Sequence, residues 1–251
     1  MDRPDIDALV DFESYSRKAV HFFSLHVPPL LASAVKAQAD GFTILDLGCG
    51  DGNIIYALKH SGLLDRAGKV IGVDLSPQRI ERFTANAGYD GIISGAERVE
   101  QIGDGKVDLL LNTMVIEHVP DDAGLLLEVK RMLKAGGLVY VTTVLKLQGA
   151  WYFRRTPDGR RALDPTHMRE YASREAFEQL IREAGLGIVE VDVSPLSFSV
   201  IHPILRIVNS IVGLRGINKI FLRKGLLSWI EKIALPIPRY RVIEVLARKK
   251  N

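Results

Sequence analysis

Three glycines at alternating positions, preceded by a carboxylate, form the most informative motif of the sequence. The run DLGCGDGN occupies residues 46–53 and follows an apolar segment at 42–47. Glycine lacks a Cβ atom, so the backbone can turn tightly there and approach a ligand closely. A helix beginning after the glycines would direct unpaired N–H groups toward an anionic group of that ligand. Because the carboxylate of Asp46 would repel a pyrophosphate, the motif favours a ligand that also carries positive charge.

A second carboxylate, Asp74, ends the apolar segment at 70–73. It follows the glycine motif by about twenty residues, the spacing at which nucleotide-binding α/β proteins place an acidic residue on the ribose hydroxyls. Asp74 could alternatively stabilise the N-terminus of the next helix through the helix dipole. Since the glycine motif precedes it, we predict a ribose contact.

Two histidines lie in polar segments farther along the chain. His118 belongs to the run EHVP at 117–120, and His167 belongs to the run LDPTHMREY at 163–171. Histidine suits proton transfer near neutral pH. We consider His167 the better candidate for a general base and His118 a second candidate, while either could instead be a structural loop residue. Cys49 is the one cysteine of the chain and no cluster with metal-ligand spacing is evident, so we expect no metal site.

The hydrophobic pattern places these residues on the loops of an α/β protein. Strand and helix patterns alternate five times, which favours a parallel sheet with helices on both faces. In such sheets ligands bind beyond the carboxyl ends of the strands, and the candidate residues follow these ends. We expect strands at 42–47, 69–74, 91–94, 107–112, 138–144, 188–193 and 242–247, and helices within 1–40 (divided at Pro28-Pro29), at 54–60, from 77, and at 120–134, 173–184 and 203–235.

These motifs resemble those of the class I S-adenosylmethionine-dependent methyltransferases, in their small-molecule methyltransferase-like branch. The resemblance covers roughly residues 40–190, and the matching stretches are 44–53, 70–76, 94–97, 107–120 and 125–143. It implies a Rossmann-like α/β fold with a seven-stranded, mostly parallel sheet, helices on both faces and helical lid elements. The final hairpin would be antiparallel and formed by 188–193 with 242–247.

The resemblance also implies S-adenosyl-L-methionine as cofactor, S-adenosyl-L-homocysteine as product, and a role for each matching residue. Gly48 and Gly50 would lie against the methionine part, with Asp46 near its ammonium group. Asp74 would bind the ribose, the Ala96 N–H would meet the adenine edge, and Asn112 would face the methyl group. Gly95 stands where the family often has an acidic residue, which leaves the adenine amino group to Glu97 or the backbone. The implied cofactor-binding set is Asp46, Gly48, Cys49, Gly50, Asp74, Leu75, Gly95, Ala96, Glu97, Asn112 and Thr113.

Aromatic and basic side chains gather in the loop at 146–169 and could bind the acceptor. Aromatic faces beside guanidinium groups suit a sugar, a phosphate or an aromatic acid. A solvated hairpin is the alternative interpretation. The predicted substrate contacts are Trp151, Tyr152, Arg154, Arg155 and Tyr171.

Charge is distributed unevenly along the chain. Eleven Lys and Arg residues stand against two Glu from residue 200 onward, whereas the whole chain has a net charge of +3. This basic end could contact an anionic substrate or the inner face of an anionic membrane peripherally, or it could be a solvated face. The N-terminus lacks a signal-peptide pattern, so we expect a cytoplasmic protein. We divide the chain into a helical lid (1–40), the cofactor-binding core (41–195), a helical basic cap (196–239), and the last strand with a basic tail (240–251).

We therefore expect an enzyme that transfers a methyl group to a small-molecule acceptor, at a hydroxyl oxygen, with a glycan or glycolipid precursor as one candidate. The run NTMV at 112–115 replaces the Asn/Asp-Pro-Pro-aromatic segment of the base-modifying relatives, so no specific nucleic-acid binding is expected. The chain could be a monomer or a homodimer. Two alternatives stay open: an NAD-type oxidoreductase, disfavoured by the glycine spacing, and a non-catalytic nucleotide-binding regulatory protein.

Overall fold

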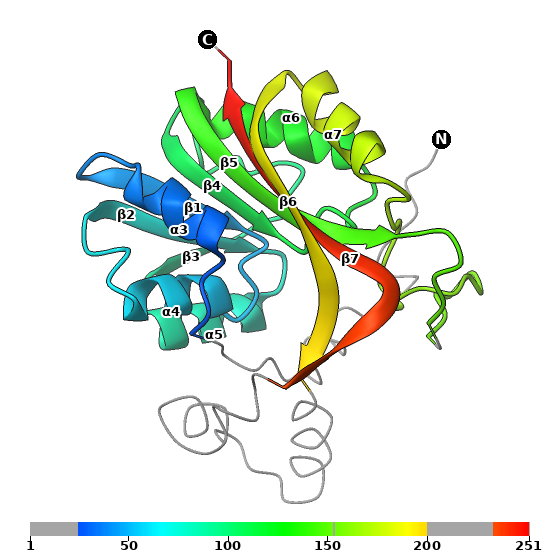
Figure 1. The fold of residues 1–251 in the computed structure, drawn as a ribbon. Coiled ribbons are helices and arrows are strands. Elements are labelled where there is room, and N and C mark those ends of the chain that lie inside the picture. The colour runs from blue at the N-terminus through cyan, green and yellow to red at the C-terminus, as the bar shows by residue number, and fades with distance from the viewer. Residues whose placement is uncertain (1–24, 153, 200–232, 251) are drawn as a thin grey trace, which may run out of the picture.

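The computed structural model describes residues 25–152, 154–199 and 233–250. Within these residues one seven-stranded sheet has the order β3-β2-β1-β4-β5-β7-β6 (Figure 1). The predicted Rossmann-like fold class is confirmed. The strands are β1 (Phe42–Leu47), β2 (Ala67–Asp74), β3 (Asp90–Ile93), β4 (Val107–Thr113), β5 (Leu133–Lys146), β6 (Leu186–Ser199) and β7 (Ala234–Lys249).

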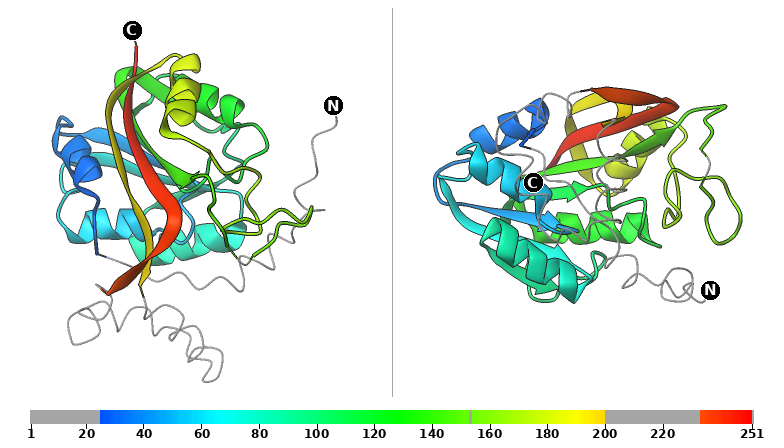
Figure 2. Two further views of the ribbon diagram at one scale, coloured as in Figure 1. Left: turned by 45° about the vertical axis from the view of Figure 1, so that its right-hand side comes forward. Right: turned by 90° about the horizontal axis from the view of Figure 1, so that it is seen from below.

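Strands β1 to β5 run parallel, and β7 runs antiparallel to both of its neighbours, β5 and β6. The predicted final hairpin is therefore confirmed. It is longer than expected, because the pairing continues from Ile188 opposite Ala247 to Ser199 opposite Ala234. The far end of this arm projects beyond the parallel strands (Figures 1 and 2).

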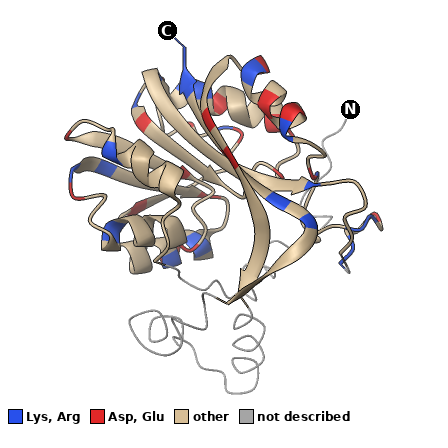
Figure 3. Ribbon diagram, viewed as in Figure 1, with Lys and Arg blue, Asp and Glu red and all other residues tan. Residues whose placement is uncertain are grey.

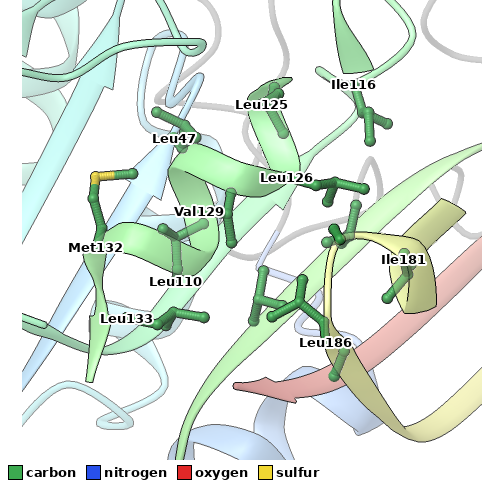
Figure 4. Close-up of a cluster of buried hydrophobic side chains, with 14 of the residues drawn as sticks. Leu47, Leu110, Ile116, Leu125, Leu126, Val129, Met132, Leu133, Ile181 and Leu186 are labelled. Atoms are coloured by element: carbon green, nitrogen blue, oxygen red, sulfur yellow. The ribbon is translucent and has the colours of Figure 1, made fainter. Parts of the chain in front are cut away.

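Alternating side chains give the sheet two apolar faces. Ile44 and Leu109 pack with helices α3 (Pro29–Lys36), α4 (Asn53–His60) and α5 (Pro77–Ala87). Leu45 and Leu110 point the other way and pack with α6 (Asp122–Met132) and α7 (Arg174–Glu183). Figure 4 shows this second cluster, in which α6 and α7 bury leucine, isoleucine, valine and methionine side chains against the sheet. The central strands are covered on both faces, so their carboxyl ends are held rigidly.

Side-chain caps fix the starts of the helices that follow the candidate loops. The Ser76 hydroxyl accepts a hydrogen bond from the Arg79 N–H, and Pro77 occupies the first turn of α5. The Ser173 hydroxyl accepts one from the Ala176 N–H at the start of α7. Both helix starts were predicted from the sequence.

Two expectations about the outer segments need correction. The predicted lid at 1–40 includes α3, but Leu31 and Ala34 of this helix are buried in the core against the sheet. The predicted helical cap at 196–239 has strands at both ends, since 196–199 belong to β6 and 234–239 belong to β7. Residues 1–24 and 200–232, on which the rest of these predictions fall, lie outside the described residues.

In the described part of the chain, none of the helices combines the length and hydropathy that crossing a bilayer requires. Figure 3 shows basic positions in two places along β7, whereas α7 carries both signs of charge.

Candidate active site

Asp46 lies at the carboxyl end of β1 and is completely buried. Neither of its carboxylate oxygens has a hydrogen-bond partner among the described residues. Burial, and after it the negative charge of Asp74, raises the pKa of Asp46 to about 8. A buried, unpaired carboxyl group is costly, so this position is suited to a ligand that brings a positive charge.

Asp74 is the last residue of the neighbouring strand β2. Its two oxygens accept hydrogen bonds from the N–H groups of Gly50 and Ser76, each at 2.9 Å. Burial raises its pKa above the ordinary value, although these hydrogen bonds and the charge of Arg79 act in the other direction. Asp74 thus fixes the glycine loop while its carboxylate stays beside that of Asp46.

The backbone conformation of the glycine loop would be strained if residues with a Cβ atom replaced its glycines. Gly48 has a φ of +82°, and a Cβ atom at this position would stand 2.2 Å from a side-chain methyl of Val115. Gly52 has a φ of +91°, and a Cβ atom there would stand 3.0 Å from the Phe83 ring. Between them, the buried thiol of Cys49 has a pKa raised by burial. The alternating glycines therefore serve both the turn and the close approach of the loop at 113–118.

Asn112 brings an amide to the same place from β4, the strand next to β1. Its Nδ2 donates a hydrogen bond to the carbonyl oxygen of Leu47 at 3.0 Å. Its Oδ1 is buried and has no partner among the described residues, and Thr113 follows it half-buried. Asp46 and Asn112 therefore each present an unsatisfied acceptor oxygen near the carboxyl ends of the neighbouring strands β1 and β4.

Beyond β4, three further polar side chains converge. Glu117 is completely buried, and its Oε2 accepts a hydrogen bond from the Thr143 hydroxyl at 3.0 Å. Burial raises the pKa of Glu117 to about 7. The rings of His118 and His167 lie edge to face with centroids 4.8 Å apart. Burial, and then the neighbouring His167, lowers the pKa of His118 to about 4. We call Glu117, His118 and His167 the histidine cluster.

Each histidine of the cluster is held by its Nδ1 atom. His167 Nδ1 lies 3.0 Å from the Glu170 carboxylate, and His118 Nδ1 lies 2.9 Å from the Thr166 hydroxyl. Burial raises the pKa of Glu170, but hydrogen bonds from His167 and other donors outweigh it, so the pKa is below its usual value. These contacts fix the orientation of both rings. A histidine held in this way is better suited to act as a general base than a mobile histidine on the surface.

Arg169 fastens the His167 loop to the segment that follows β4. Its guanidinium donates to the carbonyl oxygens of Val119 at 2.6 Å and Pro120 at 2.5 Å, and to a third carbonyl at Ile116. The backbone N–H groups of Met168 and Arg169 also reach the carbonyl of the cluster residue Glu117. The two segments of the cluster are therefore joined by backbone contacts.

Comparison with known proteins identifies the family and the fold to which these residues belong. Residues 17–191 match the model of a family described as a methyltransferase domain. The chain belongs to this methyltransferase family. Its fold is shared by an S-adenosylmethionine-dependent methyltransferase of Methanosarcina mazei, with a TM-score of 0.58, 17% identity, and coverage of 89% of this chain and 98% of the other.

Curated relatives of this methyltransferase include two proteins named ubiquinone biosynthesis O-methyltransferase. The protein of Brucella anthropi is 32% identical over 178 residues, which are 64% of this chain and 67% of the relative. The protein of Caulobacter vibrioides is 30% identical over 160 residues, which are 57% of this chain and 62% of the relative. The chain thus spans under two thirds of the length of the Caulobacter protein.

The strand-end residues fit the cofactor of this family, S-adenosylmethionine. The carboxyl group of Asp46 and the Oδ1 atom of Asn112 have no hydrogen-bond partner among the described residues. The positively charged ammonium and sulfonium groups of the cofactor would suit such acceptor oxygens. The Asp74 carboxylate, which accepts from the Gly50 N–H, ends the neighbouring strand β2. The chemistry of these acceptor groups agrees with the cofactor assigned from the family.

The residues expected near the adenine differ in their exposure and in their contacts. A Cβ atom at Gly95 would meet nothing within 4 Å, so this position borders open space, and Ala96 packs partly against the core. Glu97 accepts a hydrogen bond from the Asp121 N–H at 2.9 Å and so holds the N-terminus of α6. Leu75 is 49% exposed. The structure therefore gives the Glu97 carboxylate a structural partner that the sequence did not reveal.

The predicted substrate residues make different contacts within the protein. Trp151 is exposed beneath the Arg161 guanidinium, and Tyr152 packs edge to face on the Tyr240 ring. The other three make local contacts. These contacts are an ion pair of Arg154 with Asp164, a hydrogen bond from Arg155 to the Gly159 carbonyl, and one from the Tyr171 hydroxyl to Asp122.

Sequence reasoning left several residues of the site unassigned. Glu117 was noted only as part of a motif, and Glu170, Arg169 and Thr143 were given no role. The signal for Glu170 was its position three residues after His167, although many loops share that spacing. Arg79 was also given no role. Its positive charge lowers the pKa of both Asp74 and His118. The cofactor loop and the histidine cluster therefore border the same guanidinium group.

Proposed function

We propose that this methyltransferase transfers the methyl group of S-adenosylmethionine to a hydroxyl oxygen of a small molecule, with His167 as the general base. The observation that carries the proposal is the pairing of His167 with Glu170 beside the loop that continues from Asn112. A hydroxyl group must lose its proton to become a good nucleophile, and this cluster can accept one. The names of the curated relatives, both O-methyltransferases, support the same acceptor atom.

The bound cofactor supplies a methyl group activated by a sulfonium sulfur, so the protein mainly aligns the reactants. In our proposal Asp46 binds the ammonium group, Asp74 binds the ribose hydroxyls, and the Asn112 oxygen faces the methionyl part. His167 Nδ1 stays hydrogen-bonded to Glu170, which leaves its Nε2 to accept the hydroxyl proton. The negative charge of Glu170 would stabilise the resulting imidazolium.

The acceptor would enter along the loop at 146–169. Trp151 is 59% exposed, and its ring with the Arg161 guanidinium could hold a sugar or an aromatic acid. We also propose that the basic residues from 200 onward contact an anionic membrane or anionic substrate peripherally. This part is supported by their charge in the sequence and by Arg239 and Arg241 on β7.

Two measurements test the proposal. Calorimetry should show binding of S-adenosylhomocysteine and no comparable binding of NAD. Incubation with S-adenosylmethionine and a panel of phenols, hydroxy acids and glycosides should then yield S-adenosylhomocysteine together with a methyl ether, detected by mass spectrometry. Absence of affinity for the nucleoside would refute the cofactor site, and methylation confined to amines or thiols would refute the hydroxyl acceptor.

A further inference from the structure

The histidine cluster is formed by segments far apart in the sequence. Glu117 and His118 follow β4, and His167 lies on the loop before α7. One carboxylate oxygen and one ring nitrogen from each histidine all lie within 4.8 Å of one another. The three side chains therefore face a common point.

Hydrogen bonds determine which atoms of the two histidines keep a free lone pair. The Thr166 hydroxyl donates to the Asp164 carboxylate at 2.7 Å, so its oxygen accepts from His118 Nδ1. The Glu170 carboxylate can only accept, so the Nδ1 of His167 donates to it. Both neutral imidazoles then carry their proton on Nδ1 and a lone pair on Nε2.

Glu117 supplies a third lone pair. Its Oε2 is occupied by the Thr143 hydroxyl, whereas its Oε1 is buried and has no partner among the described residues. When Glu117 is ionised, each of the three side chains that face the common point therefore has a free acceptor atom. A buried carboxylate without a counter-charge is unfavourable, and a cation between these atoms would remove that cost.

We propose that the histidine cluster binds a divalent cation of the first transition row, such as zinc, cobalt or manganese. Two imidazoles with one carboxylate suit these ions, whereas magnesium and calcium prefer oxygen ligands. Ligand atoms on a tetrahedral ion with bonds of about 2.0–2.2 Å stand about 3.3–3.6 Å apart, so atoms 4.8 Å apart would have to close by about 1.3 Å, a movement within reach of side-chain rotation. The Nδ1 bonds to Glu170 and Thr166 are the outer contacts that orient metal-ligating histidines.

The consequence for catalysis rests on the proposed function. An acceptor hydroxyl bound at an open position of the cation would release its proton to water. Its oxygen, still bound to the cation, would then form the new bond to the methyl carbon as the carbon–sulfur bond breaks. In cation-free protein the same proton goes to His167. The Nε2 atom of His167 is therefore a ligand of the cation in one route and the proton acceptor in the other.

Cobalt(II) is the probe, because its visible absorption reports nitrogen and oxygen ligation directly. Chelator-treated protein should bind one Co²⁺ per chain, zinc should displace it, and magnesium at the same concentration should not. His167→Ala and His118→Ala should each weaken binding at least about tenfold, and Glu170→Gln, which alters an outer contact, should weaken it about ten- to a hundredfold. His60→Ala is the matched control, because His60 is an exposed histidine on α4.

Retained binding of S-adenosylhomocysteine shows that each variant is folded, and Glu117→Gln serves as an isosteric variant should the alanine variants not fold. Stoichiometric Co²⁺ binding that the cluster variants lose supports the inference. No binding, or binding that all variants retain, overturns it. Methyl transfer that persists in chelator while Co²⁺ fails to bind would reject the cation site and leave the proposed function standing.

Discussion

The two halves of the site are built in different ways. The proposed cofactor half consists of Asp46, Asp74 and Asn112, which lie near the carboxyl ends of the neighbouring strands β1, β2 and β4. The histidine half joins the segment after β4 to a loop about fifty residues later, and Arg169 and backbone hydrogen bonds hold it. Rigid strand ends suit an invariable cofactor, whereas loops on the same frame can adapt to an acceptor. We therefore expect damage to the two halves to be separable.

His167→Ala should give the largest effect and test this separation most directly. Removing the base should lower kcat by about 10²- to 10⁴-fold, while the dissociation constant for S-adenosylhomocysteine stays unchanged. Steady-state kinetics and calorimetry measure the two quantities, with His60→Ala as control. A comparable loss of cofactor affinity would show that the halves are not independent.

Asp74→Ala should have the opposite profile. A hydrogen bond to a charged group contributes about 1.5–3 kcal/mol, so cofactor affinity should fall roughly ten- to a hundredfold. Asp90→Ala, which removes an exposed carboxylate at the start of β3, is the matched control. Undiminished binding in the Asp74 variant would contradict the assigned cofactor site, provided that its thermal unfolding shows it to be folded.

Arg169→Met tests whether the contacts between the two loops position the histidine half. Loss of the guanidinium would leave the carbonyls of Val119 and Pro120 without these donors, and we expect kcat to fall about tenfold through misplacement of His167. Cofactor affinity should not change. Arg174→Met, which removes an exposed guanidinium on α7, is the control. An unchanged kcat would show that the histidine half keeps its geometry without Arg169.

Proton release on cofactor binding should be the smallest effect, and it tests whether Asp46 binds the ammonium group. Its raised pKa of about 8 means that it is mostly protonated at pH 7 in the ligand-free protein. A bound ammonium group favours the carboxylate, so binding should release up to about one proton. Calorimetry in buffers of different ionisation enthalpy measures this number, and Asp46→Asn should abolish it. Release that persists in the variant would point to another group.

The predicted elements show where sequence patterns are reliable. Caps at Ser76 and Ser173 and the apolar strands were predictable because capping and burial on both faces act within a few residues. The far end of the β6–β7 arm was not, because Leu235 and its neighbours pair across a long intervening segment. Their apolar pattern also suits a helix, and only the pairing partner on the other strand decides between the two.

The sequence by itself predicted the fold and, through the family that its motifs resemble, the cofactor class, because the glycine motif and the carboxylates after β1 and β2 are local signals. Only the tertiary structure decided that Glu117, His118 and His167 face one another. The hydrogen bonds that orient them come from Thr143, Thr166 and Glu170, which the chain brings near only after the sheet has formed. Side-chain direction and tautomer depend on such partners, and a linear pattern does not contain them.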